Sequence, residues 1–155
     1  MRIERATDED LRQVLTWFTT AEAARTWGGP NIQFPFELES LKATIDWKEA
    51  DSYVFVGDQG IVIGFIQVLN KPDRKHLVRV AISPSMRGKG LGYDFIDGLL
   101  KDASYHGSTF TLFVYDDNAS AIGLYKKLGF REVAPPDGVS KIGGCVFMER
   151  RGARL

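Results

Sequence analysis

The distribution of hydrophobic and polar positions along the chain predicts short strands and helices in a mixed order. Alternating or β-branched apolar positions predict six or seven strands, over about residues 2–5, 53–56, 61–69, 76–82, 110–114, 130–133 and 146–149. Apolar positions at helical spacing predict helices over about residues 8–18, 38–48, 89–104 and 118–128. An early antiparallel hairpin and a central strand–helix–strand unit together indicate a mixed α/β class.

Composition narrows the class of protein. The chain has 155 residues, enough for one core and one domain over residues 1–155, and its 20 basic residues balance 20 acidic ones. The single cysteine, Cys145, excludes an internal disulfide, and with two distant histidines it forms no metal site. No apolar stretch reaches membrane length, the first ten residues form no export signal, and no basic run indicates a nucleic-acid partner. We expect a cytoplasmic protein.

A glycine-rich turn at residues 87–92 lies between a predicted strand and a predicted helix. Three glycines in five residues let an anion approach the main chain, and the free amides of the helix start would bind it. The string lacks the Ser/Thr of a Walker loop and the third glycine spacing of a dinucleotide fingerprint. A kinase or a nicotinamide dehydrogenase is therefore not favoured.

Two motifs carry a more specific signal. Arg87, Gly90 and Gly92 match the pattern Gln/Arg-x-x-Gly-x-Gly/Ala. The pattern Asn-x-x-Ala-x-x-Leu-Tyr-x-x-x-Gly-Phe is met at Asn118, Ala121, Leu124, Tyr125, Gly129 and Phe130. Both motifs, in this order, resemble those of the GNAT superfamily of N-acetyltransferases.

The resemblance implies one domain with a mixed, mostly antiparallel, twisted sheet of six or seven strands. The sheet would be split between strands four and five and flanked by about four helices. Acetyl-coenzyme A would enter the split as co-substrate, its pantetheine arm pairing with the strand edge and its pyrophosphate resting on the turn, with no metal. The residues implied to bind it are Val80, Ala81, Ile82, Arg87, Gly88, Lys89, Gly90, Leu91, Gly92, Asn118 and Ala121.

The resemblance also implies catalytic roles. Tyr125 would be the general acid that protonates the departing thiolate, and one amide of residues 80–82 would stabilise the charge on the thioester oxygen. Asn118 lies about two helical turns before Tyr125, on the same face. His76 occupies the position where some relatives have a glutamate base; it serves as the base or is a structural histidine, with Glu22 and Asp116 as alternates.

The acceptor site of such enzymes is usually built by the segment after the first strand, here residues 21–51. This segment has six acidic and three basic residues, which suits a cationic amine, although charged helix faces are often only solvated. Its glycines and prolines exclude a continuous helix over residues 24–36. Trp27, Phe34 and Phe36 either line a pocket or hold the loop in place.

Three functions remain open. The first is acetyl transfer from acetyl-coenzyme A to a small-molecule amine, such as a polyamine, an aminoglycoside or an amino acid. The second is the same reaction on a protein N-terminus or lysine. The third is a coenzyme A binding module without catalysis, for which Tyr125 would have no use. Pairing of two copies through the last strands is a further expectation of the resemblance, and the length of the acyl group is left open.

Overall fold

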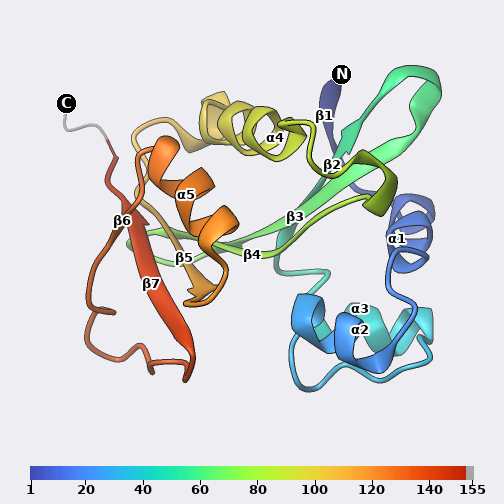
Figure 1. The fold of residues 1–155 in the computed structure, drawn as a ribbon, viewed down its shortest axis with the longest axis horizontal. Coiled ribbons are helices and arrows are strands. Elements are labelled where there is room, and N and C mark those ends of the chain that lie inside the picture. The colour runs from blue at the N-terminus through green and yellow to red at the C-terminus, as the bar shows by residue number, and fades with distance from the viewer. Residues whose placement is uncertain (153–155) are drawn as a thin grey trace.

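The computed structural model describes residues 1–152 as one twisted, seven-stranded sheet with helices on both faces (Figure 1). The strands are β1 (Arg2–Arg5), β2 (Asp51–Val56), β3 (Val62–Asn70), β4 (Lys75–Ile82), β5 (Phe110–Tyr115), β6 (Arg131–Glu132) and β7 (Cys145–Arg150). The α-helices are α1 (Asp8–Leu15), α2 (Ala21–Gly28), α3 (Leu38–Thr44), α4 (Leu91–Leu100) and α5 (Ala119–Lys127). The sheet order is β1-β2-β3-β4-β5-β7-β6, which confirms the predicted fold class.

The sheet is split in its middle, as predicted. Strands β4 and β5 run parallel and pair only at Lys75–Phe110, His76–Thr111 and Leu77–Leu112. Beyond Leu77, β4 continues beside β3 alone, while every other neighbouring pair of strands is antiparallel. Two strands that share three rungs and then diverge leave a gap that opens toward the end of β4.

Each face of the sheet carries its own hydrophobic core. On one face, α4 and α5 pack against β2 to β5, with Phe95, Leu99 and Leu112 almost completely buried. On the other face, α1, α2 and α3 pack over β2 and β3 around Leu11 and Phe65. Side chains alternate between faces along a strand, so the same strand supplies both cores.

The helices differ from the sequence prediction in number and length. Helix α2 was not predicted, because the glycines and prolines after residue 27 dominated that segment. Thr20 caps α2 by accepting a hydrogen bond from the amide of Ala23, and the helix ends at Gly28, before the prolines begin. Helices α3 and α4 are shorter than predicted, because apolar periodicity continues into turns that also pack on the core. Helix α1 begins as expected, with a capping box between Thr7 and Asp10.

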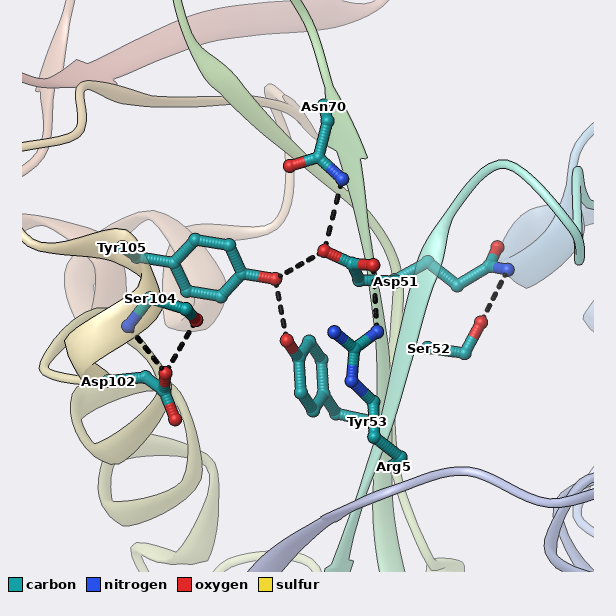
Figure 2. Close-up of polar contacts among 9 residues, drawn as sticks. Arg5, Asp51, Ser52, Tyr53, Asn70, Asp102, Ser104 and Tyr105 are labelled. Carbon is teal, nitrogen blue, oxygen red and sulfur yellow. Dashed lines mark hydrogen bonds and ion pairs between the residues drawn. The ribbon is translucent and has the colours of Figure 1, made fainter.

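A polar network, buried at Tyr53 and Tyr105 and exposed at Arg5 and Asn70, fastens the segment after α4 to the start of β2 (Figure 2). The carboxylate of Asp51 accepts hydrogen bonds from Arg5 (2.7 Å), Asn70 (3.0 Å) and Tyr105 (2.8 Å). The hydroxyls of Tyr53 and Tyr105 are 2.7 Å apart. Burial alone would raise the pKa of Asp51, but these hydrogen bonds outweigh it and lower the pKa. The network lies away from the split and serves the fold.

Candidate functional site

A large cavity, which we call the split cavity, occupies the gap between β4 and β5. Its volume is about 1570 Å³. On the α4–α5 side it is lined by the glycine-rich turn and by most of α5, and on the α2 side by most of residues 17–30; Ile142 and Cys145 also line it. The cavity therefore passes from one face of the sheet to the other at the only place, within residues 1–152, where adjacent strands diverge.

The glycine-rich turn forms the start of α4. Gly90 is the N-cap of this helix, with φ of 76°, and no side chain caps the helix. A Cβ atom at Gly88 or Gly90 would meet no atom within 4 Å, so both glycines face open space. Arg87 is exposed and its Nε donates to the carbonyl of Ile82 (3.2 Å). Uncapped helix amides beside open glycines and a guanidinium are groups that can bind an anion.

The edge of β4 that faces the cavity has no strand partner. Ala81 and Ile82 pair with β3 on one side and Val80 lies in the adjoining bulge, while β5 has already diverged on the other side. All three residues are half-buried and line the cavity. An extended chain could therefore lie along this edge in the place of a strand.

Helix α5 brings Tyr125 into the cavity wall. The side chain is 8% exposed and its ring packs edge-on against Phe130. Burial raises the pKa of Tyr125 to about 12, so the phenol keeps its proton throughout the neutral range. Asn118 and Ala121 line the same wall, but the side-chain oxygen of Asn118 caps α5 by accepting from the amide of Ala121 (3.1 Å). The sequence motif thus has a local structural role as well.

His76 lies on the α2 side of the cavity. Its neighbour Leu77 belongs to the core under α4 and α5, so alternation directs His76 to the opposite face. The imidazole stacks on Phe147 and its Nδ1 is 2.8 Å from the hydroxyl of Thr111. Burial, with Arg74 and Lys71 nearby, lowers the pKa of His76 to about 4. The ring is therefore neutral near pH 7 and only weakly basic.

The structure gathers most of the residues that the sequence predicted. Of the implied cofactor residues, Lys89 alone does not line the cavity within the described chain; it is exposed on the same turn. Glu22, one alternate base, lines the cavity, and Asp116 does not. Glu22 is also the one acid of the 21–51 segment that reaches the lining, so the negative surplus of that segment does not carry into the cavity.

Cys145 also lines the cavity, although no motif in the sequence assigns it a site role. Burial, followed by the nearby charges of Asp116 and Asp117, raises the pKa of its thiol. A raised pKa disfavours the nucleophilic thiolate. The environment of Cys145 therefore does not favour a nucleophilic role for its thiol.

Sequence reasoning missed Arg79, which lines the cavity between His76 and Val80. It is a half-buried arginine in a strand otherwise rich in apolar residues, and its φ of 54° marks a bulge opposite β3. A lone cation within the predicted strand 76–82 was the signal available in the sequence. Only the fold shows that its side chain lies at the cavity.

Residues 1–152 contain neither a helix that could span a membrane nor a cluster of side chains that could hold a metal ion. No helix in that range is both long and apolar enough for a bilayer span. Within the same residues, no cluster of three or more His, Cys, Asp or Glu side chains is arranged to hold a metal ion.

Comparison with known proteins places this geometry in context. The profile of the acetyltransferase (GNAT) family matches residues 11–130. A mycothiol acetyltransferase of Corynebacterium glutamicum is 32% identical over 87 residues, which are 55% of this chain and 30% of that protein. A peptidyl-lysine N-acetyltransferase of Salmonella typhimurium is 33% identical over 95 residues, 61% of this chain and 59% of that protein. The chain thus matches less than two thirds of the length of either relative.

The fold is shared with solved acetyltransferase structures. The spermidine N-acetyltransferase of Vibrio cholerae, in complex with CoA and spermine, superposes with a TM-score of 0.71 over 97% of this chain and 95% of that chain. The two sequences are 22% identical. This similarity confirms the architecture that the motifs predicted.

Proposed function

Because the chain belongs to the acetyltransferase (GNAT) family, we propose that it transfers an acetyl group from acetyl-coenzyme A to a primary amine. The observation that carries this proposal is the split cavity, which has an anion site at one end and a protonated phenol, Tyr125, in its wall. The family profile matches residues 11–130, which are most of the chain and include both sequence motifs.

The residues present fit acetyl-coenzyme A. The glycines at 88 and 90 leave open space where a Cβ would otherwise stand, and the start of α4 offers amides that no side chain caps. These groups, with Arg87, would hold the pyrophosphate. The unpaired edge of Val80–Ile82 would hold the pantetheine arm through the main chain. Lys89 stands at the rim of the turn and would add positive charge.

Acetyl-coenzyme A supplies a thioester, so the amine can attack it directly in a ternary complex without a covalent enzyme intermediate. Tyr125 holds a proton at its hydroxyl, and we assign it to donate that proton to the departing sulfur. A main-chain amide of residues 80–82 would donate to the thioester oxygen as negative charge develops there. The apolar walls around Tyr125 keep bulk water away from this proton.

An ammonium acceptor must lose a proton before it attacks. His76 and Glu22 are the two candidate bases that line the cavity. His76 is neutral and can accept the proton, but a pKa of about 4 makes it a weak base for this purpose. We therefore assign His76 a modest contribution, directly or through water, and retain exposed Glu22 as the alternate.

We favour a small-molecule amine as acceptor over a protein. The cavity is bordered on the α2 side by α2 and the first residues of the loop that follows it, and a wall at this position suits a small compound more than a polypeptide. The named substrates of similar proteins include both classes, since one relative acts on peptidyl-lysine and one structural neighbour on spermidine. Acetylation of a protein N-terminus or lysine is the second candidate.

Titration calorimetry with acetyl-coenzyme A tests the proposal. The Gly90→Glu variant places a carboxylate at the anion site, so we expect micromolar binding by the unmodified chain and no measurable binding by the variant. Gly138→Glu is the matched control, because Gly138 also has positive φ and open space around its Cβ position but does not line the cavity. Absence of binding to the unmodified chain, or equal binding to Gly90→Glu, would overturn the proposal.

A further inference from the structure

The guanidinium of Arg79 is held in a fixed position on the α2 side of the split cavity. Its Nε donates to the carbonyl of Gly28 (3.2 Å) and its Nη1 to the Oε1 of Gln67 (2.8 Å). The carbonyl of Arg79 itself accepts from the indole Nε1 of Trp27 (3.0 Å). Gln67 and Trp27 are buried, so the arginine is anchored on both its side chain and its main chain.

This cation has no counterion among residues 1–152. No carboxylate in that range lies within 4.0 Å of its guanidinium, and Asp46 acts on it only from a greater distance. Its two hydrogen-bond partners are neutral oxygens. A half-buried charge without an opposite charge is unfavourable, and a bound anion would relieve that cost.

Donors remain available on Arg79 for such an anion. Nε and one Nη1 hydrogen are used, which leaves the other Nη1 hydrogen and both Nη2 hydrogens. Within the described chain, Arg74 Nε is the one fully buried side-chain nitrogen or oxygen that makes no hydrogen bond. Nη2 of Arg79 makes no hydrogen bond either, so it is not fully buried and remains accessible. Two adjacent Nη donors in one plane match the two oxygens of a carboxylate.

The surroundings of Arg79 favour an anionic group on the acceptor. On the α2 side, two guanidinium groups, those of Arg79 and Arg25, line the cavity against the single carboxylate of Glu22. His76 is neutral there. Arg79 directly precedes Val80, the first residue of the edge assigned to the thioester arm, so one small molecule can reach both Arg79 and the thioester.

We propose that Arg79 binds a carboxylate of the acceptor, and that the acetylated compound is a small amino acid that carries this carboxylate close to its amine. This inference rests on the proposed acetyl transfer and narrows its substrate class. It narrows the predicted small-molecule amines to amino acids, and of the six acidic residues that suggested a cationic amine the fold places five outside the cavity.

Paired acceptors test the inference in the full chain. Acetyl transfer from acetyl-coenzyme A is followed by thiol release with the proteinogenic L-amino acids, each beside its amide and its decarboxylated amine. We expect the best amino acid to exceed both analogues in kcat/KM by roughly 10- to 100-fold, as for loss of one hydrogen-bonded charged group. In Arg79→Gln this preference should disappear, through a higher KM for the amino acid and an unchanged KM for the amide.

A second variant separates binding from folding. Arg79→Lys keeps the charge but not the paired donors, so it should keep part of the preference. Thermal unfolding and acetyl-coenzyme A affinity, measured on each variant, detect a merely structural role. Equal use of acids and amides by the unmodified chain, an equal loss for both in Arg79→Gln, or acetylation of polyamines or protein lysines alone would overturn the inference. If no amine of any class is acetylated, the proposed function itself fails.

Discussion

His76 and Thr111 hydrogen-bond each other (Nδ1–Oγ1 2.8 Å) at the middle of the three rungs that join β4 to β5. The imidazole also stacks on Phe147 and meets the edge of Phe113. This enclosure holds the ring in its neutral form, because burial and the nearby positive charges lower its pKa to about 4. The His76–Thr111 hydrogen bond thus lies at the last rungs before the split, and the burial of the same ring keeps this part of the cavity wall uncharged.

The stability of the protein should therefore depend on the protonation of His76. An unfolded histidine binds its proton near pH 6.5, whereas folded His76 binds one only near pH 4. The contribution of neutral His76 to the free energy of unfolding is therefore fully present above pH 6.5 and is lost as the pH falls toward 4. Between pH 7.5 and 4.5 the unmodified chain should lose about 2 kcal/mol more unfolding free energy than His76→Gln, which does not titrate. Urea denaturation at both pH values measures this, and equal losses would show that His76 titrates normally.

Catalysis should depend only modestly on His76. Because its pKa is far below the working pH, His76→Gln should lower kcat by no more than about tenfold, less than an efficient general base contributes. Glu22→Gln, measured in parallel, shows whether the exposed carboxylate contributes more. A loss of a hundredfold or more in His76→Gln, with an inflection of kcat near pH 6.5 in the unmodified chain, would contradict this assignment.

Removal of the Tyr125 hydroxyl should affect turnover much more than binding. We expect Tyr125→Phe to lower kcat by roughly a hundredfold, since the general acid is lost, while acetyl-coenzyme A affinity and thermal stability stay near their original values. Because the pKa of Tyr125 is about 12, its ionisation should cause no decline in rate up to pH 10. Tyr115→Phe is the control, as Tyr115 lines the same cavity but is 45% exposed. Equal effects of the two variants would argue against a proton donor at Tyr125.

The network around Asp51 should contribute to stability alone. In Tyr105→Phe the hydroxyl that bonds both Tyr53 and Asp51 is gone, which leaves the buried hydroxyl of Tyr53 without this partner and should cost about 1–3 kcal/mol (Figure 2). Urea denaturation measures the loss, with Tyr93→Phe as an exposed control. Acetyl-coenzyme A affinity should not change, because the network lies outside the cavity. A large change in affinity would show that the network also influences the cofactor site.

Gly64 marks a close approach between β3 and α4. A Cβ atom there would lie 2.8 Å from Phe95 Cδ2 and 3.2 Å from Ile82 Cδ1. Phe95 cannot move freely, since it stacks on Phe55 in the core. Gly64→Ala should therefore destabilise the fold by about 1–3 kcal/mol through overpacking. Gly143→Ala, where a Cβ meets nothing within 4 Å, should have little effect in the same denaturation experiment.

Local patterns were sufficient for much of the fold and part of the site. The capping box at Thr7 and the β-branched run at 76–82 each specify an element from adjacent residues, and the structure has both. The two motifs place Gly90 and Tyr125 on one cavity because each motif is tied to the start or the face of a helix. Helix α2 was missed because its stop signals are stronger than its short apolar pattern.

The sequence by itself determined the strands, most helices and the motif residues, since these depend on the spacing of neighbouring side chains and on backbone propensity. Tertiary structure alone decided which charged residues meet in the cavity. Asp51 is drawn into a network outside the cavity, while Arg79 is turned by a bulge toward Gly28 and Gln67 and has no counterion within residues 1–152. Charge summed along a segment cannot reveal this, because the field in a cavity depends on which side chains the fold brings to it and how deeply each is buried.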